Sequence, residues 1–242
     1  MRRRFALAAL VLLLPGVAAA QQRPAQRYSA DWLVTTQGLS QTWHVQVDGE
    51  RMRADLSAYE LVDLQLWSCP QRAIVRHDLK KIGLVIPYKQ RFEEFAYDPA
   101  VDLSDLDRRE GVEELGPESV NGESAKKFRT TQNGDTVLFW LAKADGVLLK
   151  ASSSGSPGYA LDVRNLKRGP QLASAFDLPA GLARADRTTE SAADVASGLL
   201  STLAPSLGSL MQTGQLETLP PEQRARVARE CRAAEVPGLF GQ

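Results

Sequence analysis

The chain has 242 residues, of which 43% are hydrophobic and 24% are charged, and its 29 Lys and Arg residues balance its 29 Asp and Glu residues. A formal net charge of zero, without a basic stripe, argues against nucleic acid as a partner. The aliphatic content favours a packed globule over disorder, and the length is sufficient for one large domain with its own core.

Residues 1–20 predict an export signal. Residues 2–4 are arginines, residues 5–14 are an apolar run, and residues 18–20 are small. The run is shorter than the about 20 residues that a membrane-spanning helix needs, so we favour cleavage after Ala20 over a membrane anchor. The general secretory route fits this strongly apolar run better than the twin-arginine route, which the arginines match loosely. We therefore expect an exported protein.

The first strands are expected directly after a short polar leader. Between residues 28 and 35, and again between residues 43 and 47, apolar residues alternate with polar ones, which is the period of a strand with one buried face. Asp48 and Gly49 then turn the chain into a partner strand around residues 52–56. This pattern predicts a long β-hairpin.

The next segment is less regular. Residues 59–67 are ambiguous between a short helix and a strand, because their apolar residues fit neither period well. Residues 73–77 and 82–86 predict a second hairpin around the turn at residues 78–81. Residues 88–97 are rich in aromatic residues and predict a further strand or an extended flap. Residues 98–114 are dense in charge and predict a solvated helix or loop.

The two cysteines are Cys69 and Cys231. In an oxidising compartment a disulfide can persist, and two cysteines allow one intramolecular pairing. We expect this bond, with two buried free thiols or an intermolecular bridge as the alternatives.

Residues 115–181 predict consecutive β-hairpins. Asn-Gly and Asp-Gly pairs at residues 121–122, 133–134 and 145–146 supply the positive φ angles that tight hairpin turns need. They separate expected strands, which are residues 126–131, 136–142, 147–152 and 159–166. Residues 136–141 are apolar on both faces, so each face needs a cover, and we expect a helix of the tail to be one of them.

The tail predicts helices. Apolar residues recur at helical spacing at Val195, Leu199, Leu203, Leu207 and Leu210, with a break or kink at Pro205. Pro220 and Pro221 open a second helix that continues through Val227 and Cys231. The expected organisation is thus a signal at residues 1–20, a β domain at residues 21–189 and a helical tail at residues 190–242.

No catalytic, cofactor-binding or metal site is predicted. His44 and His77 are the two histidines, and neither has a metal-ligand partner at useful spacing. His77 and Asp78 could form half of a catalytic triad, which also needs a serine presented on a strained turn. The serine-rich residues 152–158 are instead typical of a flexible hairpin loop. The paired glutamates at residues 93–94 and 113–114 point to opposite strand faces. An enzyme is therefore unsupported.

Aromatic and aliphatic residues on the expected strands are the remaining candidates for function. Core packing is the first explanation for each of them. The functional alternative is a concave sheet whose apolar inner face holds an acyl chain or another hydrophobic ligand. The candidate cavity residues are Trp32, Val34, Trp43, Val45, Val47, Leu84, Ile86, Phe92, Phe139 and Leu141.

Several motifs resemble the LolA/LolB-like family of periplasmic proteins. Residues 116–122 with residues 127–129 resemble its "G-x-E-x-V-N-G … K-y-x" hairpin, and residues 139–150 look like its "W-x-a-x-d-x-G-l-P-l-K" strand pair. Leu148 stands where proline is usual. Residues 165–169 and 176–181 match the closing "N-i-k-x-g … F-x-l-P-a-G" motif. The resemblance covers most of residues 27–181.

The resemblance implies a mainly β fold, namely an unclosed, strongly curved antiparallel β-barrel wrapped around helices, with an apolar cavity between them. It implies no catalytic or ligand-binding residue, because these motifs form turns and strands. Our first hypothesis is a periplasmic module, not integral to the membrane, that holds the acyl chain of a lipid or lipoprotein without chemistry or cofactor. The second is an interaction or regulatory protein, with envelope proteins as partners, whose cavity is filled by its own helices.

Overall fold

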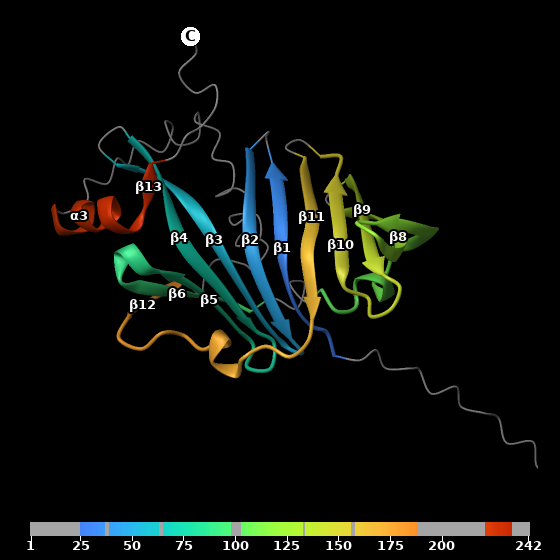
Figure 1. Cartoon of the computed structure of the whole chain (residues 1–242), viewed down its shortest axis with the longest axis horizontal. Coiled ribbons are helices and arrows are strands. Elements are labelled where there is room, and N and C mark those ends of the chain that lie inside the picture. The colour runs from blue at the N-terminus through green and yellow to red at the C-terminus, as the bar shows by residue number, and fades with distance from the viewer. Residues whose placement is uncertain are drawn as a thin grey trace, which may run out of the picture.

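The computed structural model describes residues 25–36, 39–62, 65–97, 103–132, 134–155, 158–187 and 221–233. The expected export signal and the helically spaced leucines of residues 195–210 lie outside these ranges. Strands dominate the described part of the chain (Figure 1), as the period-two pattern predicts.

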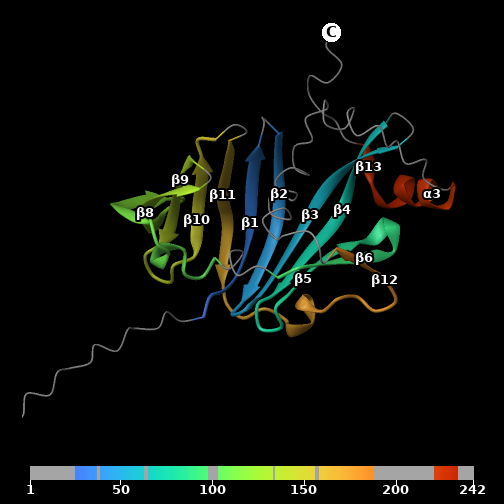
Figure 2. The same ribbon diagram turned by 180° about the vertical axis from the view of Figure 1, so that it is seen from behind.

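In the described residues, thirteen strands form one curved sheet, in the order β12-β6-β5-β4-β3-β2-β1-β11-β10-β9-β8-β7, with β13 paired to β4. Neighbours are antiparallel, except that β12 runs parallel to β6. The ends of the sheet lie on opposite sides of the molecule (Figures 1 and 2), so the barrel does not close. The fold class that the sequence predicts is confirmed. The strands are β1 (Arg27–Thr36), β2 (Leu39–Asp48), β3 (Arg51–Val62), β4 (Gln65–Arg76), β5 (Lys81–Ile86), β6 (Arg91–Phe95), β7 (Glu113–Val120), β8 (Glu123–Gln132), β9 (Asp135–Ala142), β10 (Leu148–Ser153), β11 (Tyr159–Arg168), β12 (Ala183–Arg187) and β13 (Arg232–Ala233).

Most expected strands and turns are confirmed, and the ambiguous segment is now assigned. Residues 59–62 complete β3 and residues 65–67 begin β4, with pairing that runs from Tyr59 opposite Ser68 to Val62 opposite Gln65. The aromatic-rich residues divide into the 3-10 helix η1 (Pro87–Lys89) and the strand β6. Within the charged residues, 103–112 contain the short 3-10 helix η3 (Leu106–Arg108).

The turn between β7 and β8 shows why the Asn-Gly signal works. Asn121 and Gly122 have φ angles of 53° and 82°, as a two-residue hairpin with the right-handed strand twist requires. The Asn121 side chain also donates hydrogen bonds to the Asp162 carboxylate (2.7 Å) and the Val163 carbonyl oxygen (2.8 Å). The tip of this hairpin is therefore attached to β11.

The register divides the sheet into two faces, because directly opposite residues on paired strands share a face. One row runs through Ala30, Val45, Ala54, Ala73 and Leu84. We call the face that carries this row the apolar face. The neighbouring row runs through Asp31, His44, Asp55 and Arg72 on the opposite face, which we call the ion-pair face.

The connection from β11 to β12 covers part of the ion-pair face. It contains the 3-10 helix η4 (Ala173–Phe176), and Phe176 is buried with the Arg51 guanidinium 5.1 Å from its ring centre. Leu178 approaches Gly83 so closely that a Cβ there would lie 3.1 Å from its Cδ2, so a glycine is favoured at this position. The edge strand β12, which the sequence analysis did not predict, follows this connection.

In the described residues, the covers of β9 come from outside the tail, and the expected covering helix at residues 195–210 lies outside the described ranges. On one side, Phe139 and Leu141 pack with Phe128 beneath Leu103, Leu106 and Val112, which belong to the charged segment rather than to a tail helix. On the other side, Lys127 and Lys150 place their ammonium groups over the Trp140 ring, each 4.9 Å from its centre. The described tail helix, α3 (Pro221–Glu230), packs instead against β4 and η1.

Candidate functional site

The centre of the apolar face is a pair of tryptophans. Trp32 of β1 and Trp43 of β2 lie directly opposite each other, and their side chains are 4% and 8% exposed. Val34, Val45 and Val47 extend this centre along the two strands and are also buried in the same cluster. These five candidate cavity residues are therefore brought together by the β1–β2 hairpin.

The other five candidates separate into different surroundings. Leu84 packs at the edge of the tryptophan cluster, and Ile86 belongs to the cluster that holds α3. Phe139 and Leu141 share the apolar face but pack under residues 103–112, so the chain itself already covers them.

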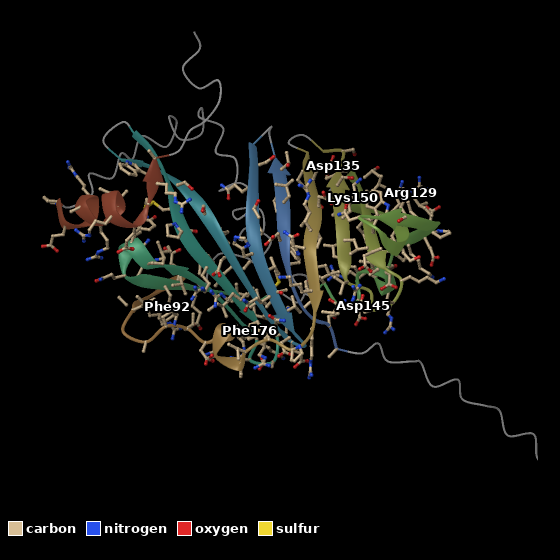
Figure 3. The ribbon with its side chains drawn as sticks, viewed as in Figure 1. Phe92, Arg129, Asp135, Asp145, Lys150 and Phe176 are labelled. Atoms are coloured by element: carbon tan, nitrogen blue, oxygen red, sulfur yellow. A yellow bond between two sulfur atoms is a disulfide. The ribbon has the colours of Figure 1, made fainter. Side chains whose placement is uncertain are left out.

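Phe92 lies on the wrong side for the proposed cavity. It is opposite Val85 in the β5–β6 pair, one position out of phase with the apolar row. It therefore belongs to the ion-pair face, and Figure 3 shows it at the β6 end of the sheet. The sequence could not reveal this, because residues 88–97 contain a 3-10 helix that resets the strand phase.

Three polar side chains of the tryptophan region carry buried atoms without a hydrogen-bond partner in the described part of the chain. The Nε1 atoms of Trp32 and Trp43 are two of these groups, and both amide atoms of Gln41 are the third. Gln41 lies opposite Val34, so it shares the apolar face. The sequence analysis missed Gln41, although the signal was present, because it has the same phase as Trp43, Val45 and Val47.

The predicted disulfide between Cys69 and Cys231 is confirmed. It joins β4 to the residue that follows α3, across a sequence separation of 162. Val227 of α3 is 1% exposed and packs in the cluster of Cys69, Ile86 and Tyr88. The bond therefore fixes α3 over the β4–β5 end of the apolar face, as both views of the ribbon show (Figures 1 and 2).

On the ion-pair face, polar groups are joined across strands. Asp55 accepts hydrogen bonds from Arg53 (2.6 Å) and Arg72 (2.7 Å). Burial opposes the ionisation of Asp55, but the bonds from the two guanidinium groups outweigh it and hold its pKa below the ordinary value. This carboxylate therefore stays charged at neutral pH.

His44, which contacts a carboxylate, also lies on the ion-pair face. The Nδ1 atom of His44 is 2.6 Å from Asp31 Oδ1, and Asn165 donates to Asp31 Oδ2 at 2.6 Å. The bond from Asn165, followed by the contact with His44, lowers the pKa of Asp31. The His44 side chain is 70% exposed, so the arrangement is a surface pair without a pocket around it. His77, in turn, contacts the Tyr97 hydroxyl at 2.9 Å.

Two further searches bear on the class of site. Among the described residues, no group of three or more His, Cys, Asp or Glu side chains could hold a metal ion. None of the helices in the same residues is long and apolar enough to span a membrane.

Comparisons with known proteins give fold similarity at low identity. No family model and no curated protein matches the chain. An uncharacterized conserved protein from Thermus thermophilus aligns with a TM-score of 0.47 and 15% identity, over 67% of this chain and 91% of that chain. MucB in complex with MucA(peri) aligns with a TM-score of 0.42 and 15% identity, over 65% and 56%, and PNGF-II with 0.43 and 13%, over 74% and 33%. The chain thus spans just over half of MucB and a third of PNGF-II, and similarity at this level carries no argument about function.

Proposed function

We propose that this chain is a periplasmic, non-catalytic binding protein that holds the acyl chain of a lipid or lipoprotein against the apolar face of its half-barrel. The observation that carries the proposal is the extent of this face. Buried apolar side chains continue across β11, β1, β2, β3 and β4, from Val163 through Trp32 and Val45 to Ala73. The α3 helix packs only at the β4–β5 end.

The energetics of an acyl chain fit such a surface. Each buried methylene contributes about 0.8 kcal/mol, so a chain of moderate length offsets the entropic cost of association. Val34 and Val45 are each 1% exposed in this structure. Binding therefore requires a rearrangement that exposes these side chains to the acyl chain.

A second candidate is favoured by the position of α3. Val227 and Cys231 already occupy one end of the apolar face, and a disulfide holds them there. A regulatory or interaction protein whose own C-terminal residues fill its cavity would have this arrangement, with other envelope proteins as partners. The two candidates differ in whether α3 must leave before an acyl chain enters.

Uptake of a fluorescent fatty acid by detergent-free protein distinguishes them. Wild type should bind the probe, Val45→Trp should weaken uptake by narrowing the apolar face, and Gln46→Trp, on the opposite face of the same strand, should not. Uptake only by the double variant Cys69→Ser/Cys231→Ser would favour the second candidate. Failure of both wild type and double variant to bind would reject acyl binding.

A further inference from the structure

Burial without hydrogen bonding sets three polar groups apart from the surrounding core. In the described residues, the indole N–H groups of Trp32 and Trp43 and the carboxamide of Gln41 have no partner. The two tryptophans are more than nine-tenths buried. Since native cores satisfy almost all buried polar groups, such a cluster calls for a physical reason.

The register places these groups in one patch. Trp32 is directly opposite Trp43, and Gln41 is two residues from Trp43 on the same face, next to Val34. Opposite side chains start about 5 Å apart, and the next positions along the face about 7 Å apart. A single ligand group can therefore reach more than one of them.

The scarcity of cationic side chains on the apolar face indicates that the ligand group bound there is uncharged. On the apolar face, the described positions of β1 to β5 carry no Lys or Arg. On the flanking strands, three cations already pair with carboxylates: Arg168 with Asp145 (2.6 Å), Arg91 with Glu93 (2.7 Å) and Lys126 with Glu114 (3.1 Å). The Nε atom of Arg91 has no partner among the described residues, but β6 lies four strands from β2 in the sheet. An anionic headgroup would thus be buried without a counter-charge, which is strongly unfavourable.

We propose that Trp32, Trp43 and Gln41 form a polar subsite for the uncharged ester or amide group of an acylated ligand. The indole N–H groups and the Gln41 amide N–H donate to ester or amide oxygens, and the Gln41 carbonyl accepts from a ligand hydroxyl or N–H. The acyl chain then lies along Val34, Val45 and Val47. This inference rests on the proposed function and defines the class of ligand.

The test compares 1-monooleoylglycerol, oleate and octadecene as competitors for a bound fluorescent probe. Wild type should bind the monoacylglycerol about tenfold or more tightly than either oleate at neutral pH or octadecene, since one hydrogen bond is worth about a factor of ten. Gln41→Leu should reduce this preference about tenfold and leave octadecene binding unchanged. Gln46→Leu makes the same change on the ion-pair face of the same strand and should keep the preference.

A melting-temperature measurement distinguishes a loss of selectivity from misfolding of the variant. Because Gln41→Leu removes a buried unpaired amide, its ligand-free melting temperature should equal or exceed that of wild type. Trp43→Phe is the second variant and should also lose selectivity. Two results would reject the subsite while acyl binding stands. In the first, wild type binds all three compounds equally. In the second, the variants keep the preference for the monoacylglycerol, as expected if buried water alone satisfies these polar groups. If neither wild type nor the double variant Cys69→Ser/Cys231→Ser binds any of the three compounds, both proposals fail.

Discussion

The two faces of the same sheet treat polar groups in opposite ways. On the ion-pair face, Asp31 and Asp55 accept hydrogen bonds from side chains of neighbouring strands, and Glu118 accepts one from Trp140, two strands away. On the apolar face, Gln41 and two indoles are buried without partners in the described residues. Because one alternating sequence produced both faces, the difference reflects what each face contacts, and the unpaired groups point to a ligand rather than to structural need.

Breaking the disulfide should have the largest effect, and it acts on the covered end of the apolar face. The double variant Cys69→Ser/Cys231→Ser should lose up to about 5 kcal/mol of unfolding free energy, because the bond closes a loop of 162 residues. Denaturant unfolding measures this loss, and wild type under reducing conditions is the control. An unchanged midpoint would show that α3 does not depend on the bond.

Removing methyl groups from the centre of the apolar face should lower the unfolding free energy by a smaller amount. Val45→Ala removes two methyl groups at a position that is 1% exposed, so we expect a loss of about 2 kcal/mol. Thr42→Ala, at an exposed position on the ion-pair face of the same strand, should change stability by less than about 0.5 kcal/mol. Equal effects of the two variants in denaturant unfolding would remove the energetic distinction between the faces.

Asp55 tests the ion-pair face and its pH dependence. Asp55→Asn should cost about 2 kcal/mol at neutral pH, because the bonds from Arg53 and Arg72 lose a charged acceptor. Since the folded pKa is lowered, this stabilisation is complete above the unfolded pKa of about 3.9 and is lost as the pH falls through the folded pKa.

The difference between wild type and Asp55→Asn should therefore shrink in acid, as thermal unfolding from pH 7 downward can measure. Asp105→Asn is the matched control, since the contact of Asp105 with Arg108 is exposed and 3.5 Å long. A stability difference that is the same at every pH would contradict a role for the charge of Asp55.

The smallest effect is expected at the hairpin tip on the ion-pair face. Asn121→Gly keeps the positive φ angle but removes the bonds to Asp162 and Val163, so a loss of about 1 kcal/mol is expected. Asn121→Ala should lose about 1 kcal/mol more, because alanine is strained at this φ angle. If glycine and alanine have equal melting temperatures, the turn conformation contributes little.

Turn motifs and the period-two pattern of the strands predicted most of the fold. The hairpins around Asp48-Gly49 and Asn121-Gly122 were predictable because local φ requirements and alternation act over a few residues. The cover of Phe139 by residues 103–112 was not, because its three apolar residues are scattered among charges. The edge strand β12 was also missed, because it pairs in parallel with β6, which is distant in sequence.

The candidate site was predictable in part. Period two correctly grouped Trp32, Val34, Trp43, Val45 and Val47, because all five lie within one hairpin. It failed for Phe92, where the 3-10 helix at residues 87–89 intervenes and shifts the phase. Gln41 was visible only as a polar residue in an apolar phase, and its lack of a partner requires coordinates.

The indole N–H signals in a nuclear magnetic resonance spectrum test the central claim most directly. The chain has four tryptophans, and Trp140 provides an internal reference because its Nε1 already donates to Glu118 at 2.9 Å. Tryptophan-to-phenylalanine variants assign the signals. On addition of 1-monooleoylglycerol, the signals of Trp32 and Trp43 should shift downfield as they acquire hydrogen bonds, while that of Trp140 stays in place. Saturable binding that leaves the Trp32 and Trp43 signals unmoved would contradict the account.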